Sequence, residues 1–285
     1  MGQIITIGFA SGALLGLLAI GIVLVYKASR VLNFAQAEIG NFATYIAWFL
    51  IIDFGLPWAV GGFLALAAAG AIGFVFERFI VRPMLNGPKL AIAVATLGLM
   101  SLLGFIESEW EPRFIRPPIS GRGPEIFGIF VSPTRLLAFF SAIALGAALY
   151  WFVKRTTFGL GLLASAHDPV AVRLMGIRMK HLSLFTWVTA SLLGGLAGLL
   201  ALSATGNFGA FSMTFSFLVP ALAAALLGGM TSLPGAFAGG MLIGVLQTAL
   251  SFNFGSIPGV EQLGAFAVLI AVLVLRPQGL FGKVA

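Results

Sequence analysis

Nine apolar segments separated by short polar stretches occupy most of the chain. Each is long enough, or nearly so, to cross a hydrocarbon core about 30 Å thick as a helix. The pattern predicts an all-α, polytopic membrane bundle of about eight or nine transmembrane helices, forming one domain over 1–285. The predicted segments are 8–26, 39–52, 58–76, 90–106, 136–153, 183–202, 218–230, 234–254 and 262–275.

Two of these segments, 39–52 and 218–230, are short and broken. Polar residues 33–41 precede the first, and the Gly228-Gly229 pair interrupts the second. Non-helical backbone at membrane depth survives where it is buried in protein or lines a cavity. Short, Gly- or Pro-interrupted segments in both halves of a transporter point to its transport path. Each break precedes a helix rich in small residues, which suggests a faint internal repeat; re-entrant segments are the alternative to full crossings.

The distribution of basic residues predicts the orientation. Twelve of the sixteen Lys and Arg residues lie at 27–30, 77–90 and 154–181 and in the C-terminal tail. The positive-inside rule places these loops in the cytoplasm, which gives nine crossings with the N-terminus outside and a periplasmic loop at 107–135. With 60% hydrophobic and 9% charged residues, the net charge of +7 indicates topology and not nucleic-acid binding.

The loop 154–181 contains a complete signal for a short helix. Asp168 is a good N-cap, Pro169 suits the first helical position, and Gly176 is a natural C-terminal stop. A capped helix on a basic cytoplasmic loop indicates a segment held by another protein. The alternative is a basic loop that only sets topology.

Enzymatic chemistry has little support in the sequence. There is no cysteine, and both histidines lie in the loop 154–181, so neither a histidine-based triad nor a metal site can form within the bilayer. No G-x-x-x-x-G-K-[ST] phosphate loop is present. We therefore expect a chain that binds no cofactor and takes its energy from a partner.

Three motifs occur together: N-F-A-Q-A-E-I-G at 33–40, A-S-A-H-D-P-V-A-V-R-L-M-G-I at 164–177 and A-L-L-G-G-M-T-S-L-P-G-A-F-A-G-G at 225–240. Over about 8–281 the chain resembles the H-type permease subunit of branched-chain amino acid ABC importers, a binding-protein-dependent permease family of the bacterial inner membrane. The resemblance implies the larger-class importer fold, similar to that of the vitamin B12 importer. It also implies a second, M-type permease forming a heterodimer, two cytoplasmic subunits that bind ATP and Mg, and a periplasmic substrate-binding protein.

The resemblance also assigns roles to residues. Contact with the ATPase would involve Ala164, Asp168, Pro169, Ala171, Arg173, Gly176 and Ile177. The translocation path would involve Asn33, Phe34, Ala35, Gln36, Glu38, Gly40, Gly228, Gly229, Pro234 and Gly235. The family often has His-Gly where this chain has Gln36-Ala37, and usually a Lys where it has Pro220, so substrate choice can differ.

Several features have two interpretations. Glu38 either lines the path or makes a structural hydrogen bond, and the pairs Gly12/Gly16, Gly194/Gly198, Gly235/Gly239 and Gly240/Gly244 indicate close helix packing. The charged group Glu107, Glu109, Glu111, Arg113 and Arg116 forms a solvated face or a docking site for the binding protein. Phe208, Phe211, Phe215 and Phe217 are candidates for lining an apolar outer vestibule.

A rival function is a stand-alone channel or ion-coupled carrier for urea, amides or similar solutes. An ion-coupled carrier needs ionisable groups within the membrane. Apart from Glu38, the predicted segments contain almost none.

Overall fold

The first helix lies at the centre of the bundle. In the computed structural model, α1 (Gly2–Ser29) is buried at every position from 12 to 25. The structure describes residues 2–85, 87–110, 119, 121, 123–126, 129–165, 172, 176–205, 209–276 and 278–281. A helix that is apolar on all sides can be buried in protein or face lipid, and here the neighbouring elements cover it.

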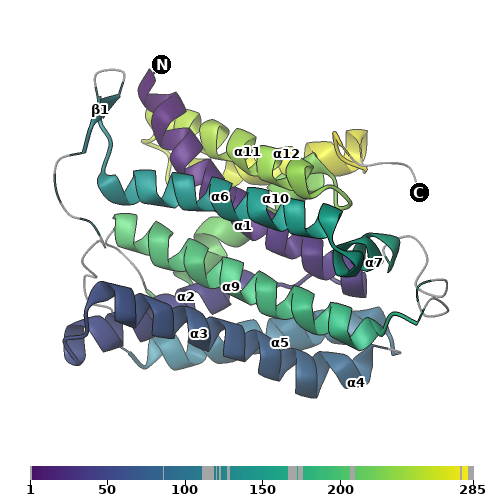
Figure 1. The fold of residues 1–285 in the computed structure, drawn as a ribbon. Helices are drawn as coiled ribbons and strands as arrows, with labels where there is room; N and C mark the ends of the chain where they lie inside the picture. Colours follow the sequence, from purple (N-terminus) through teal and green to yellow (C-terminus); the bar gives the residue numbers. More distant parts are fainter. Residues whose placement is uncertain are drawn as a thin grey trace.

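The remaining helices pack in two groups on either side of α1 (Figure 1). One group contains α10 (Val219–Gly228), α11 (Leu233–Phe254) and α12 (Val260–Leu275). The other contains α2 (Gln36–Trp48), α3 (Trp58–Phe76), α4 (Arg82–Met84), α5 (Lys89–Ser108) and α9 (Met179–Thr205). A long helix, α6 (Pro133–Arg155), lies along α1 and leads into α7 (Thr157–Ser165).

In the described part of the chain, three short π-helical segments extend these helices, and two of them run on into the next helix. They are η1 (Phe49–Asp53) after α2, η2 (Glu77–Val81) after α3, and η3 (Thr214–Leu218) before α10. π-Helical segments are rare and are often found at functional sites. Here η1 forms the end of the short predicted segment 39–52, and η3 leads into the other one, 218–230.

Glycine contacts bring the central helices together. A Cβ on Gly12 would lie 2.8 Å from the carbonyl oxygen of Gly240, and one on Gly244 would overlap the Gly12 backbone. Likewise, a Cβ on Gly40 of α2 would overlap the carbonyl of Gly194 in α9. The prediction that the paired glycines serve close helix packing is confirmed.

The same contacts bear on the suggested repeat. After each break, a helix rich in small residues crosses a central helix through glycine: α2 crosses α9, and α11 crosses α1. This correspondence agrees with an internal repeat, which stays a prediction.

Helices cover the nine predicted segments, apart from Gly229 and Met230 at the end of the seventh. Among the described residues, six helices are long and apolar enough to cross a membrane: α1, α3 with its continuation to Met84, α5, α6, α9 and α11. In the same part of the chain the all-α prediction is confirmed except for one small hairpin, in which β1 (Glu125–Ile126) pairs antiparallel with β2 (Ile129–Phe130).

The two ends of the bundle differ in charge. Residues from three of the predicted cytoplasmic loops, Arg30, Arg82, Lys89, Arg178 and Lys180, line one cavity at the end where α1 finishes. We call this the basic end. The N-terminus of the chain lies at the opposite end (Figure 1).

Candidate functional site

Residues 31–35, which precede α2, form a non-helical segment that runs back into the bundle. The Gln36 side-chain amide donates a 2.9 Å hydrogen bond to the carbonyl of Leu18. Leu18 lies eleven residues before the end of α1, or about 16 Å at the helical rise. Residues 31–35 therefore descend from the basic end into the protein interior, and the predicted break before the second segment is confirmed.

Hydrogen bonds hold this entry in place. The Asn33 side-chain oxygen accepts from the Ala35 N–H at 3.1 Å, and the Phe34 N–H donates to the Thr96 hydroxyl at 3.3 Å. Asn33, Ala35 and Gln36 are fully buried. The backbone groups that a helix would satisfy internally are thus partly satisfied by side chains, as membrane depth requires.

Glu38 belongs to a buried polar cluster that joins three distant segments. Its carboxylate accepts from the Phe211 N–H at 3.1 Å and from the Thr214 hydroxyl. The Asn41 side-chain amide donates to the Glu107 carboxylate at 2.6 Å and to the Gly209 carbonyl at 2.9 Å. We call Glu38, Asn41, Glu107 and Thr214, with the Phe211 N–H, the carboxylate cluster.

The cluster corrects one prediction. Glu107 was expected on a solvated face of the loop 107–135, but it is the penultimate residue of α5 and is fully buried. α5 extends past the apolar run because Asn41 and the Phe211 N–H, at 3.4 Å, provide donors for this carboxylate. The statement that the segments hold almost no ionisable group besides Glu38 is wrong for the same reason.

The chemistry of the carboxylate cluster follows from the closeness of its two acids. Glu38 and Glu107 both accept from the Phe211 N–H. In the described part of the chain, neither has a basic side chain within ion-pair distance. Two buried carboxylates this close repel each other unless donors offset their charge, and the Asn41 amide, the Thr214 hydroxyl and the Phe211 N–H are such donors. The structure shows the hydrogen bonds of Glu38, and its role in the translocation path stays a prediction.

The second predicted break is also present. α10 ends at Gly228, and Gly229 has φ +94°, a conformation that side chains with a Cβ rarely adopt. The backbones of Gly228 and Gly235 touch, so that a Cβ on either would overlap the other residue. The Ser232 hydroxyl caps α11 by accepting from the Gly235 N–H at 3.1 Å. Close backbone approach therefore explains these glycines, and a role in the path stays a prediction.

Pro234 faces away from this turn. It lines an apolar groove of about 360 Å³ together with Ile20, Tyr150 and Phe237. Its position in the first turn of α11 suits proline, because no helical hydrogen bond is lost there.

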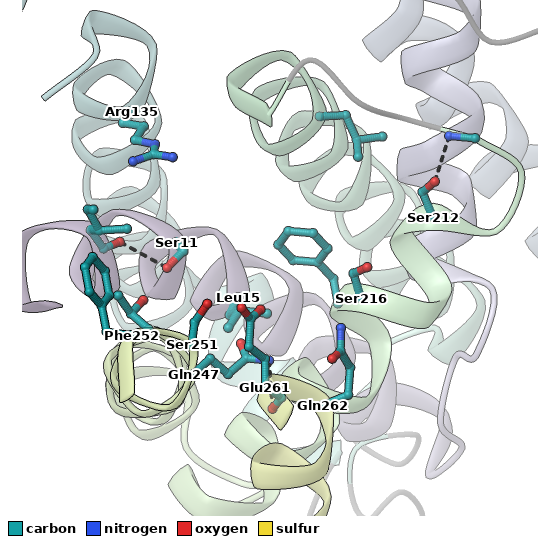
Figure 2. Close-up of a pocket in the computed structure, with 15 residues that line it drawn as sticks. Ser11, Leu15, Arg135, Ser212, Ser216, Gln247, Ser251, Phe252, Glu261 and Gln262 are labelled. Atoms are coloured by element: carbon teal, nitrogen blue, oxygen red, sulfur yellow. Dashed lines mark hydrogen bonds between the residues drawn. The ribbon is translucent and has the colours of Figure 1, made fainter. Parts of the chain in front are cut away.

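A large pocket of about 770 Å³ opens at the end of the bundle opposite the basic end. Figure 2 shows it between α1, α6, η3, α11 and α12. Its polar lining residues include Ser11, Ser212, Ser216, Gln247, Ser251 and Gln262, and the charged residues among its described lining are Arg135 and Glu261. Leu15, Phe217 and Phe252 supply apolar surface. We call this the Arg135–Glu261 pocket.

The lining of this pocket suits a small amphiphilic solute. Binding sites combine apolar walls with a few polar groups that fix orientation. Gln247 is itself positioned by a 3.4 Å hydrogen bond to the backbone carbonyl of Glu261. None of the residues predicted to line the path is among the described residues that line this pocket.

The four phenylalanines predicted for an outer vestibule separate in the structure. Phe217 lines the Arg135–Glu261 pocket, whereas the Phe211 ring covers Gly104 and the Phe215 side chain is exposed. Phe208 lies outside the described residues. Among the three that the structure describes, Phe217 alone lines this pocket, and an apolar vestibule stays a prediction.

Part of the predicted coupling segment is described. Asp168, Pro169, Ala171 and Arg173 lie outside the described residues. Gly176 has φ +80°, and the Ile177 N–H donates to the Val172 carbonyl at 3.3 Å. A left-handed glycine with this hydrogen bond is the Schellman arrangement that ends a helix. The predicted stop at Gly176 is confirmed.

The end of that segment packs on α7. A Cβ on Gly161 would lie 2.9 Å from the Ile177 side chain, so the two are in close contact. Ala164 lies half-buried in the last turn of α7. Contact of Ala164, Gly176 and Ile177 with an ATPase stays a prediction.

Several functional candidates were missed from the sequence. Asn41, Glu107 and Thr214 form the carboxylate cluster, and Gln247 and Glu261 line the pocket. A carboxylate directly after the apolar run 90–106 was the available signal for Glu107, because an acid at that position either faces water or is paired inside. The pocket residues carried no such signal.

Comparison with known proteins agrees with this architecture. Residues 4–273 match the family described as branched-chain amino acid transport system / permease component. The high-affinity branched-chain amino acid transport system permease proteins BraD of Pseudomonas aeruginosa and LivH of Escherichia coli K12 are 29% and 28% identical to the chain. In both cases the alignment covers 97% of the chain and 94% of the relative.

More distant proteins are also similar. The probable branched-chain amino acid transport permease protein LivH of Methanocaldococcus jannaschii is 28% identical, over 94% of the chain and 89% of that protein. A solved structure, PsaBC from Streptococcus pneumoniae in complex with Fab, superposes with a TM-score of 0.54 over 95% of the chain and 91% of the solved chain. At 13% identity, this likeness shows the fold alone.

Proposed function

The chain belongs to the branched-chain amino acid transport system permease family, and on that premise we propose that it imports branched-chain or other hydrophobic amino acids as one subunit of an ATP-binding-cassette complex. It is a multi-pass protein of the inner membrane. The observation that carries the proposal is the family match over residues 4–273, which includes all three motifs noted in the sequence.

The energy would come from partner subunits. Two cytoplasmic ATPases would bind ATP and Mg and grip the segment that ends at Gly176. The helix stop at Gly176 and its contact with α7 through Ile177 support this role. Because α7 continues directly from α6, a force on this segment would reach a helix that lies along α1.

The substrate would pass between this chain and a second permease, expected to be the longer M-type. A periplasmic binding protein would deliver it to the end of the bundle where the Arg135–Glu261 pocket opens. Hydroxyl, amide and charged groups beside apolar walls suit an amino acid with an aliphatic side chain. The buried helix α1 and the likeness to the solved structure support the larger-class importer fold.

Reconstitution tests this function. The chain, its partner permease, the ATPases and the binding protein are placed in liposomes, and uptake of radiolabelled leucine is measured with and without ATP. We expect uptake only with ATP and binding protein, competed by valine and isoleucine and not by urea. Uptake by the chain alone, without ATP, would overturn the proposal.

One observation favours the rival function of an ion-coupled carrier. That function needs ionisable groups inside the membrane, and Glu38 and Glu107 are both buried there. The same liposomes distinguish the two functions, because an imposed proton gradient would drive uptake by a carrier in the absence of ATP.

A further inference from the structure

A second cavity, of about 610 Å³, lies at the basic end. It is enclosed by the end of α1, the α4–α5 connection and the start of α9. We propose that this basic cavity binds the phosphate group of an anionic phospholipid from the adjacent leaflet. The inference depends on which residues gather at this end and not on which solute the protein carries.

The charge of the cavity favours an anion. Its described lining includes five basic residues, and none of the described residues that line it is acidic. Arg82 is held by Glu77 through a 2.8 Å ion pair, so its charge is largely balanced. Lys89, Arg178 and Lys180 bring further positive charge to the same space. Basic pockets between helices on the cytoplasmic side of a membrane are suited to lipid headgroups.

A buried hydroxyl supplies a second, independent indication of a ligand. Ser183 lines the cavity and is only 1% exposed, and its oxygen has no hydrogen-bond partner in the described part of the chain. The other two lining serines differ, because Ser29 donates to the Val25 carbonyl at 2.7 Å and Ser165 to that of Leu162 at 2.8 Å. Buried hydroxyl groups are normally paired, so Ser183 has a donor to offer to a phosphate oxygen.

The surroundings favour a lipid phosphate over a free one. Lys89 begins α5, and the helix then exposes Leu90, Val94 and Leu97, with exposed fractions of 74%, 57% and 41%. Their spacing places these three side chains along one face of the helix. Acyl chains can lie against this face while the headgroup occupies the cavity beside Lys89.

The test measures lipid retained by the full chain, purified with whichever subunits accompany it. The protein is placed in nanodiscs of phosphatidylcholine with a small fraction of phosphatidylglycerol, and bound lipid is counted by native mass spectrometry. Removing two charges with R178Q and K180Q together should lower phosphatidylglycerol retention about 25-fold, since each basic residue near a membrane contributes about fivefold. The matched control is K154Q with R155Q, which removes two charges outside the cavity at the same end.

A milder variant keeps the proposal testable if the charge variant does not fold. Ser183→Ala should lower retention about tenfold. Ser203→Ala should not, although Ser203 lies in the same helix and also has a buried oxygen without a partner among the described residues. Equal retention in the two serine variants would overturn the proposal.

Other occupants give different results. Inorganic phosphate or ATP stabilising the detergent-solubilised protein as much as phosphatidylglycerol does would indicate a soluble phosphate and overturn the lipid assignment. Release of the lipid when the ATPase subunits bind would indicate that an acidic protein surface fills the cavity, and would overturn it as well. These outcomes are independent of leucine uptake, so they are distinguishable from failure of the proposed function.

Discussion

Asn41 donates a 2.6 Å hydrogen bond to the carboxylate of Glu107, which lies 66 residues further along the chain. The bond joins α2 to α5, and the second proton of the same amide joins both to the Gly209 carbonyl. A single asparagine therefore connects three segments at the point where the chain enters η3 and α10. A movement of the segment that begins at Gly209 relative to α2 must either keep or break the bond from Asn41 to the Gly209 carbonyl.

The first prediction concerns the hydrogen bonds of the carboxylate cluster. Glu107→Gln keeps the size of the side chain and an oxygen that accepts from Asn41, and should leave the free energy of unfolding within about 1 kcal/mol of the wild type. Glu107→Ala leaves the buried Asn41 amide with one acceptor fewer and opens a cavity, and should destabilise by about 2–4 kcal/mol. Thermal unfolding followed by tryptophan fluorescence compares the two. Equal destabilisation by both changes would contradict a stabilising role for the acceptor at position 107.

The second prediction concerns the crossing of α2 and α9. Gly40→Ala places a Cβ against the carbonyl of Gly194, so the helices must separate. We expect a loss of about 1–3 kcal/mol in stability and less folded protein in the membrane. Gly98→Ala in α5 is the control, because its Cβ would meet nothing within 4 Å in the described part of the chain. That change should be neutral or slightly stabilising, as alanine is the better helix former.

The third prediction separates coupling from folding. Gly176→Ala forces a Cβ into a left-handed backbone and should cost about 1–2 kcal/mol in the end of the segment. ATP-driven uptake should fall while the amount of inserted protein stays the same. Gly55→Ala places the same strain after η1, since Gly55 has φ +67°, and should leave uptake unchanged. Equal losses in both variants would remove the argument for coupling at Gly176.

The fourth prediction concerns the Arg135–Glu261 pocket. Ser216→Trp fills part of the pocket and should lower uptake at least severalfold, with little change in melting temperature because the ring enters open space. Ser108→Trp, on an exposed position at the end of α5, is the control and should leave uptake unchanged. Normal uptake by Ser216→Trp would show that the substrate does not pass this way.

Features encoded by local sequence were predictable. The segment 58–76 coincides with α3, and the Gly228-Gly229 pair ends α10, because apolar runs and glycines act on the residues beside them. The stop at Gly176 was predicted for the same reason. The glycine pairs on one helix face also predicted close helix packing, but they did not predict which helices would meet.

Features that depend on distant residues were not predictable. Phe211 lies 173 residues from Glu38, and no local pattern brings its N–H to that carboxylate. The Arg135–Glu261 pocket likewise draws on elements far apart in the chain, from α1 to α12. Glu107 was misplaced because a carboxylate after an apolar run resembles the start of a loop until its donors are known.

The enclosure of α1 has a consequence for biosynthesis. α1 is made before α11, yet its glycine face is covered by α11, which begins at Leu233. During translation this helix must remain in lipid, with its groove open, until most of the protein has followed. The helix can stay in lipid during this time because it has no charged residue before Lys27 that would need a polar partner. A nascent chain that stops before Leu233 would expose the uncovered groove, which provides a surface by which membrane quality control can recognise an unfinished protein.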